Sequence, residues 1–402
     1  MKKLPFIKEN LGLMLILSVL IGVIVGVVDT IFGQILIYLT DLRSQHSLLL
    51  IPFLAPAGML FTYYFLKYGK NSSKGMGLIF QAGHQEEDDI PKRLVPFVIL
   101  GTWITHLFGG SAGREGVAIQ VGASISLVAH SFMKRVDASQ FIVIGMAAGF
   151  AGLFETPIAA SFFALEVLTV GALRYDALLP TLFAAFSANI TSKGLGLEKF
   201  SVAIKDSPSI DAGIFFKLVI LGIIFGLCGG AFSTTLNKMK VLLVEKLPNP
   251  VRRVGIMGIL LSVLLLLLFV GRYAGLGTNL INASFSAATI KPYDWLFKAI
   301  LTILTVAAGF QGGEVTPLFA IGSTLGVVLS SIFALPATLV AALGYASVFG
   351  SATNTFLAPI MIGAEVFGFE NLPYFFIVSS VAFVFNGNKS IYGNQKVTNM
   401  LK

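Results

Sequence analysis

The chain has 402 residues, of which 55% are hydrophobic and only 12% are charged. Soluble domains carry about 25% charged residues, so this composition excludes an ordinary soluble protein and indicates several membrane crossings. The net charge of +8 requires no nucleic-acid partner, because basic residues in cytoplasmic loops account for it. One cysteine and four histidines without metal-ligand spacing give no reason to expect a metal or another cofactor.

The chain begins with three lysines among its first eight residues, followed by an apolar run over 11–28. Such a run is long enough to cross a bilayer core of about 30 Å as a helix. We expect a turn at Asp41–His46, a return over 48–66, and a basic loop at Lys67–Arg93. The positive-inside rule then predicts a multi-pass membrane protein with its N- and C-termini in the cytoplasm.

The stretch FGGSAGREGVAIQ, Phe108–Gln120, places Arg114 and Glu115 among glycines in an apolar surrounding. A charged side chain at the bilayer centre costs about 2.5–3.5 kcal/mol by insertion scales, so its presence indicates a function. Glycines interrupt helices, and a helix start at membrane depth offers free N–H groups and a positive dipole end to an anion. We therefore expect anion-binding helix starts after Gly75-Met76-Gly77, after Gly113 and after Gly313.

The chain contains an internal repeat at an offset of about 200 residues. GREGVAIQVGASI from Gly113 aligns with GEVTPLFAIGSTL from Gly313, and GMG at 75–77 aligns with GLG at 275–277. ETPIAASFFALEV at 155–167 aligns with NTFLAPIMIGAEV at 354–366. Repeated halves are typical of transporters. The aligned acids, Glu166 and Glu365, are expected to have structural roles at helix ends.

We predict an all-α polytopic membrane protein built from two repeated, inverted halves of tilted and broken transmembrane helices. The single transmembrane domain, 1–402, is expected to divide into a first half, 1–195, a polar linker, 196–211, and a second half, 212–402. Identity alone does not reveal the inversion, which requires an odd number of crossings in each half. We expect no cytoplasmic regulatory domain.

Four stretches together resemble the CLC family of chloride channels and proton-coupled antiporters. They are Gly75-Met76-Gly77-Leu78-Ile79, Gly113-Arg114-Glu115-Gly116-Val117, Gly313-Glu314-Val315-Thr316-Pro317, and Tyr392 in SIYGNQ. They occur in the family's order and cover essentially the whole chain. The resemblance implies a CLC-type fold, an anion site at these helix starts, and a homodimer with one pore in each subunit.

The departures from the usual family pattern resemble its fluoride-selective bacterial branch. Met76 replaces a serine and Val117 a proline, while Glu314 and Thr316 flank Val315 in the third stretch. Val167 occupies the position at which many family antiporters have a second, proton-relaying glutamate. Loss of that glutamate favours fluoride transport over chloride–proton exchange.

Glu115 is expected to act as a protonatable gate. As an anion tethered to the protein, its carboxylate can occupy the site of the transported anion, and protonation releases it. That competition would couple the two ions. The alternative is a structural ion pair between Glu115 and Arg114, which leaves the surrounding glycines unexplained.

Glu314 is the second candidate for proton coupling, and its alternative role is to cap its own helix. The expected anion ligands are Met76, Gly313, Glu314, Val315, Thr316 and Tyr392. Among them, the hydroxyl groups of Thr316 and Tyr392 are donors, although Thr316 could be a helix cap and Tyr392 an interfacial aromatic. Met76 removes a donor available in chloride-selective relatives, or simply fills a gap. The expected backbone of the helix starts comprises Gly75, Gly77, Gly113, Arg114 and Gly116.

These features predict a secondary transporter, not an enzyme: a fluoride/proton antiporter that exports cytoplasmic fluoride against inward protons. A chloride/proton antiporter and an anion channel of the same architecture remain the alternatives. A membrane serine protease using Ser124 would need a histidine base, and His130, six residues later, is the last histidine in the chain. The expected partners are fluoride, protons, the lipid bilayer and a second copy of the chain.

Overall fold

The computed structural model describes residues 7–87, 90–286 and 288–398. Helices make up most of this part, and one short parallel pair joins β1 (Thr169–Val170) to β2 (Lys396–Val397). Lys2 and Lys3, which support the predicted cytoplasmic N-terminus, lie outside the described residues, as do the last four residues of the chain.

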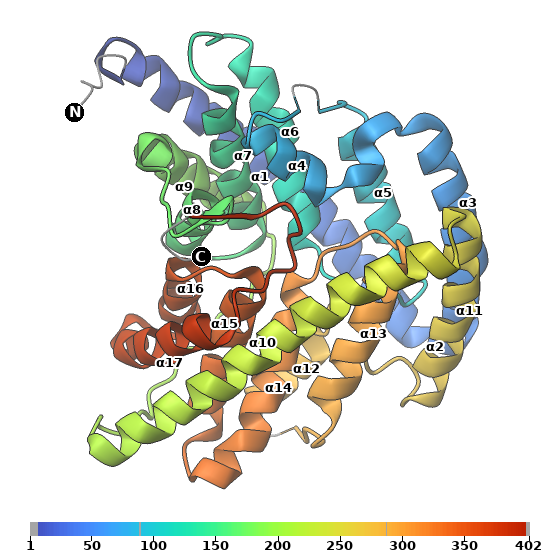
Figure 1. Ribbon diagram of the computed structural model, residues 1–402, viewed down its shortest axis with the longest axis vertical. Helices are drawn as coiled ribbons and strands as arrows, with labels where there is room; N and C mark the ends of the chain where they lie inside the picture. Colours follow the sequence, from blue (N-terminus) through green and yellow to red (C-terminus); the bar gives the residue numbers. More distant parts are fainter. Residues whose placement is uncertain (1–6, 88–89, 287, 399–402) are drawn as a thin grey trace.

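Apart from the short α2, which has no counterpart in the second set, the same order of helices occurs twice along the described part of the chain (Figure 1). The first set comprises α1 (Ile7–Gln45), α2 (Ser47–Leu50), α3 (Leu54–Tyr68), α4 (Met76–Gly83), α5 (Leu94–Leu107), α6 (Glu115–His130), α7 (Ala138–Leu153), α8 (Pro157–Glu166) and α9 (Leu178–Gly194). The second comprises α10 (Ala212–Lys246), α11 (Pro250–Leu267), α12 (Thr278–Ser284), α13 (Asp294–Ala308), α14 (Val315–Phe333), α15 (Ala337–Thr353), α16 (Leu357–Phe367) and α17 (Leu372–Phe385). Short 3₁₀ turns lie at η1 (Ile51–Phe53), η2 (Lys70–Lys74), η3 (Tyr175–Ala177) and η4 (Phe369–Asn371).

The two sets meet at equivalent residues. The Gly113 N–H donates to the Gly313 carbonyl at 2.5 Å, and the Gly313 N–H donates to the Gly113 carbonyl at 2.8 Å. The two segments are antiparallel at this bridge. Since equivalent residues that bond each other reciprocally lie on a local twofold axis, the two halves are related by a twofold rotation at this contact. Inversion across the membrane stays a prediction. The predicted all-α fold of repeated halves is confirmed.

Helix α1 is far longer than the bilayer is thick. Its 39 residues span about 58 Å at the α-helical rise, so it must tilt strongly to stay within a core of about 30 Å. The predicted turn at Asp41–His46 is wrong, because α1 continues to Gln45. Arg43 explains the continuation: its buried guanidinium donates to the His106 carbonyl at 3.2 Å, which holds the last turn against α5.

Several helices are shorter than a membrane span because they start or stop inside the protein. Among the described residues, five helical segments are long and apolar enough to cross a bilayer. The short helices are held by close backbone packing: a Cβ on Gly122 would overlap the Gly145 carbonyl between α6 and α7. In the second half, Gly322 and Gly344 make the same contact between α14 and α15. Glycine pairs thus let these broken helices approach each other.

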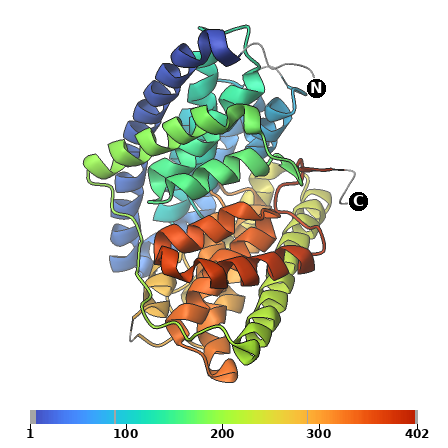
Figure 2. The same ribbon diagram turned by 90° about the vertical axis from the view of Figure 1, so that its left-hand side faces the viewer.

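The segment between α9 and α10 contains no helix and runs along the outside of the molecule from one half to the other (Figure 2). It packs on the end of α16, because the Val202 N–H donates to the Val366 carbonyl at 2.9 Å and the Ile204 N–H to the Phe367 carbonyl at 3.0 Å. The division into 1–195, 196–211 and 212–402 remains a prediction.

Candidate functional site: a carboxylate in an anion cradle

Glu115 is the first residue of α6, and its side chain is completely buried. Its Oε2 accepts the backbone N–H of Arg114 at 3.1 Å and that of Thr316 at 3.0 Å. Its Oε1 accepts the Thr316 hydroxyl. The carboxylate therefore lies at the first turn of α14, in a cradle of three donors contributed by both halves. Donors of this kind, at a helix start, bind anions.

The alternative of an Arg114–Glu115 ion pair accounts for little of this geometry. Arg114 Nε lies 4.0 Å from Glu115 Oε1, which is beyond hydrogen-bond distance. The Arg114 side chain is buried, and its Nε and Nη1 have no hydrogen-bond partner among the described residues. The short contacts of Glu115 go instead to backbone N–H groups and to Thr316.

Glu314 and Val315 begin α14 beside this cradle, directly after Gly313. Glu314 occupies the N-cap position but makes no side-chain cap hydrogen bond, so the alternative role as a cap of its own helix is wrong. Its Oε1 instead lies 3.5 Å from Lys240 Nζ of α10. The cradle around Glu115 uses the Thr316 N–H; anion binding by the N–H groups of Glu314 and Val315 stays a prediction.

Met76 is the first residue of α4 and is half-buried. Its Cγ lies 3.8 Å from the position of a Cβ on Gly116, so the thioether faces the start of α6. Gly75, at φ +55°, provides the backbone conformation that ends η2 and starts α4. Gly77 lies near Asn394, which places the start of α4 beside the Tyr392 segment. The structure thus brings the first, second and fourth sequence stretches together.

Tyr392 is 7% exposed and lies between two phenylalanine rings that the sequence did not distinguish from the other phenylalanines. Its ring stacks on Phe80 of α4, with centroids 5.0 Å apart, and meets the edge of Phe163 of α8 at 6.4 Å. No hydrogen-bond partner of its hydroxyl occurs within the described part of the chain. The two rings orient the tyrosine. Their spacing in the sequence does not indicate this role, which becomes visible only in the folded structure.

The cradle is approached from one face by a cavity of about 360 Å³. Its lining includes the buried Arg114 and Thr316, the exposed Asp41 and Glu198, and the half-buried Lys199. Lys199 is fixed by the carbonyls of Ala151 and Phe154, at 3.3 and 3.1 Å from its Nζ. The linker thus contributes charged residues to this cavity, a role that its polar composition alone did not indicate.

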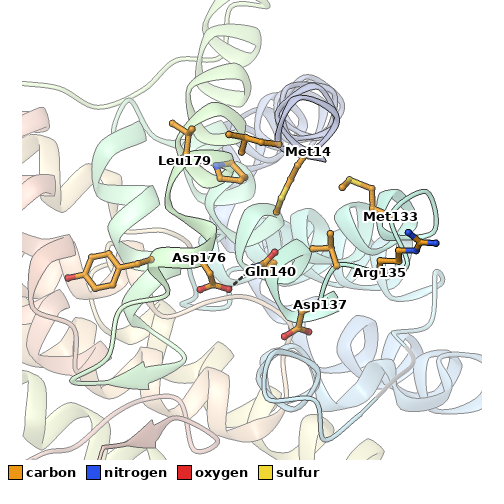
Figure 3. Close-up of a pocket in the computed structure, with 11 residues that line it drawn as sticks. Met14, Met133, Arg135, Asp137, Gln140, Asp176 and Leu179 are labelled. Atoms are coloured by element: carbon orange, nitrogen blue, oxygen red, sulfur yellow. Dashed lines mark hydrogen bonds between the residues drawn. The ribbon is translucent and has the colours of Figure 1, made fainter. Parts of the chain in front are cut away.

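A separate cavity of about 300 Å³ lies between the start of α1, the α6–α7 turn and α9 (Figure 3). Two of its lining residues bond each other, since Gln140 donates to Asp176 at 2.7 Å. A third, Asp137, accepts the N–H of Ser139, a residue outside the cavity lining, at 2.9 Å. None of the residues predicted for anion binding or gating lines it.

The aligned acids Glu166 and Glu365 each cap the start of a helix in the other half of the molecule. Glu166 accepts the N–H groups that start α16, those of Phe356, Leu357 and Ala358, at 3.1, 3.0 and 2.8 Å. Glu365, in α16, accepts the N–H groups of Ile158 and Ala159 in α8, at 3.0 and 2.8 Å. Their predicted structural role at helix ends is confirmed, with each acid serving the helix of the other half.

Val167 follows Glu166 and is fully buried. Because its side chain is a hydrocarbon, this position carries no group that can relay a proton. Its carbonyl accepts the Gln395 side chain at 2.8 Å, which ties the end of α8 to the segment after Tyr392.

Residues 57–387 match the family described as voltage gated chloride channel. The chain belongs to this family. As a member of it, the chain is similar to a "Chloride/fluoride channel protein" of Pseudomonas syringae pv. tomato, with 35% identity over 98% of this chain and 88% of the relative.

Two solved structures share the fold of this chain. A crystal structure of a CLC-type fluoride/proton antiporter is 57% identical, with a TM-score of 0.96 over 97% of this chain and 99% of that one. A slow cyanobacterial Cl⁻/H⁺ antiporter is 21% identical, with a TM-score of 0.82 over 94% of this chain and 96% of that one. The second likeness shows the fold alone.

Proposed function

We propose that this protein is a fluoride/proton antiporter that exports cytoplasmic fluoride in exchange for inward protons. The observation that carries the proposal is the Glu115 carboxylate held in the anion cradle of Arg114 and Thr316. The 57%-identical fluoride/proton antiporter and the relative described as a chloride/fluoride channel protein support fluoride as the substrate.

Competition for one cradle is the proposed coupling step. While ionised, Glu115 is held by charge-assisted hydrogen bonds, and these weaken when a proton neutralises it. The protonated side chain then leaves the cradle, and fluoride takes the three donors in its place. When Glu115 loses its proton, the carboxylate returns and displaces the anion. Proton and anion therefore exchange at one point, with no distant switch between them.

The remaining site residues have proposed roles around this step. Glu314 takes or stabilises a proton beside the anion path. It would replace the second proton-relaying glutamate of other family antiporters, at whose position this chain has the apolar Val167. Tyr392 supplies a hydroxyl donor, and Met76 withholds one, which favours fluoride over chloride. The glycine-rich segments Gly75–Gly77 and Gly113–Gly116 provide the backbone of the helix starts of α4 and α6 at the site.

Basic residues support a cytoplasmic placement for the face that carries the Tyr392 segment. This segment contacts the 67–93 loop, since Lys396 Nζ lies 2.6 Å from Glu86 Oε1. It also contacts the end of α10, since Asn237 donates to the Ser390 carbonyl at 2.8 Å. Basic residues gather on these elements: Lys67, Lys70, Lys74, Lys92, Arg93, Lys238, Lys240, Lys246, Lys389 and Lys396. By the positive-inside rule, we propose a bacterial inner-membrane protein with both termini in the cytoplasm.

We propose further that two copies associate through α8, α16 and α17, each retaining its own pore. The family resemblance implies a homodimer, and this face has an apolar groove of about 470 Å³. The groove is lined by Phe162, Leu357, Ile360, Met361, Leu372, Pro373, Phe376 and Ile377. Ile360→Trp should fill it and shift the detergent-solubilised protein toward the monomer in light-scattering measurements. An unchanged dimer would place the interface elsewhere.

Transport in liposomes tests the central proposal. A proton gradient imposed across vesicles containing the protein should drive fluoride uphill, followed with a fluoride electrode, and should move chloride far less. Glu115→Gln should abolish the dependence of fluoride transport on the proton gradient. Glu198→Gln, at an exposed residue of the cavity of about 360 Å³, should keep that dependence. Uphill chloride transport would favour the chloride/proton antiporter, and flux indifferent to protons in the unmodified protein would favour a channel.

A further inference from the structure

Glu314 directs its carboxylate away from its own helix start. It makes no side-chain cap hydrogen bond in α14, and its Oε1 lies 3.5 Å from Lys240 Nζ. Across the described ranges, Lys240 is the single basic side chain in ion-pair contact with it. The pair joins α14 to α10, two helices far apart along the chain.

Lys240 lies near the end of α10, which stops at Lys246. One turn earlier, Asn237 donates its Nδ2 to the Ser390 carbonyl at 2.8 Å. Residues three apart share a helix face, so Lys240 lies on the face of α10 that contacts the Tyr392 segment. The ammonium group is therefore placed where this segment approaches the start of α14.

The two partners differ in exposure. The Lys240 side chain is 39% exposed, whereas that of Glu314 is 12% exposed. Lys240 thus lies at the boundary between water and the buried site, on the face proposed to be cytoplasmic. An anion moving from that face to Tyr392 and the cradle would meet this pair first.

An ionised Glu314 by itself would repel an arriving anion. We propose that Lys240 is a positioning residue for fluoride uptake from the cytoplasm: it offsets the charge of the Glu314 carboxylate, so that the carboxylate does not repel fluoride at the inner mouth. The inference rests on the proposed function and specifies how that site collects its substrate.

Inside-out membrane vesicles, which present the cytoplasmic face to the medium, test this role. The fluoride KM and the maximal rate of proton-driven fluoride movement are measured for Lys240→Met, Lys240→Arg and Lys238→Met. Lys238 is the matched control, since it is exposed, two residues away, and makes no ion pair among the described residues. Lys240→Met should raise the fluoride KM roughly five- to tenfold with a maximal rate within about twofold of the unmodified protein. Lys240→Arg should restore the KM.

The double variant Lys240→Met with Glu314→Gln decides whether Lys240 acts through Glu314. In the Glu314→Gln background, removal of Lys240 should change the KM less than about twofold, because no carboxylate remains to be offset. An equal rise in KM for Lys238→Met, a normal KM for Lys240→Met, or a full effect of Lys240→Met in the Glu314→Gln background would each overturn the proposal. Absence of proton-driven fluoride flux in the unmodified protein would instead overturn the proposed function itself.

Discussion

Thr316 holds Glu115 twice, through its backbone N–H at 3.0 Å and through its hydroxyl. The two residues are 201 positions apart in sequence and belong to different halves of the repeat. One half therefore supplies the competing carboxylate, and the other supplies most of its cradle. Under the proposed mechanism, a change at Thr316 alters both the position of the Glu115 carboxylate and the site that fluoride would take.

Thr316→Val should weaken fluoride transport. It keeps the size of the side chain and the backbone N–H but removes a donor worth about 1 kcal/mol, or roughly five- to tenfold in apparent affinity. Thr316→Ser retains the hydroxyl and serves as the control. Fluoride uptake by liposomes across a range of concentrations measures both. Equal behaviour of the two variants would exclude a role for the hydroxyl.

Glu314→Gln should reduce the coupling between proton and fluoride movement. The amide keeps the shape of the side chain but cannot accept a proton from an acid at physiological pH. Simultaneous recording of pH and fluoride should show fewer protons moved per fluoride, by at least about twofold. Glu370→Gln, at an exposed acid of η4, controls for loss of a surface charge. Normal coupling in Glu314→Gln would remove this residue from the proton path.

Met76→Ser should raise chloride flux relative to fluoride flux. The hydroxyl restores, next to Gly116, the donor that chloride-selective relatives have at this position and that the thioether does not offer. A change of about tenfold in the flux ratio is expected, equivalent to about 1.4 kcal/mol. Met257→Ser, in the buried core of α11, should lower stability and leave the ratio unchanged. An unchanged ratio of chloride flux to fluoride flux in Met76→Ser would show that Met76 only fills space in the core.

Glu166→Gln and Glu365→Gln should each destabilise the protein without changing ion selectivity. Each substitution turns charge-assisted bonds at the start of α16 or α8 into neutral ones, a loss of about 1–2 kcal/mol. The unfolding midpoint in detergent should fall for both, and the fluoride-to-chloride flux ratio should stay constant. Glu198→Gln, at a residue that makes no ion pair among the described residues, is the control. An altered flux ratio would assign these acids to the ion path.

The sequence predicted the elements of this fold better than its contacts. The motif at Gly113 and its partner at Gly313 share one offset, and this predicted both the repeat and the helix starts at Glu115 and Val315. The turn expected at Asp41–His46 failed because Arg43 binds the carbonyl of His106, a contact that polarity along the chain cannot reveal.

The candidate site was predicted as a set of residues rather than as a geometry. The sequence placed Glu115 at an anion-binding helix start, but not the two bonds from Thr316. Glu314 could equally have capped α14, and nothing in the local pattern paired it with Lys240. Both features arise from tertiary packing between the halves, which a single sequence without aligned relatives does not encode in any local pattern.

The reciprocal bonds between Gly113 and Gly313 have a mechanical consequence. They fasten the segments before α6 and α14 to each other at the point where the two halves are related by symmetry. A rocking motion of one half against the other would have to turn about these two bonds, directly beside the anion cradle. Around such a fixed pivot, the gate proposed here needs only a movement of the Glu115 side chain, with little movement of the two halves.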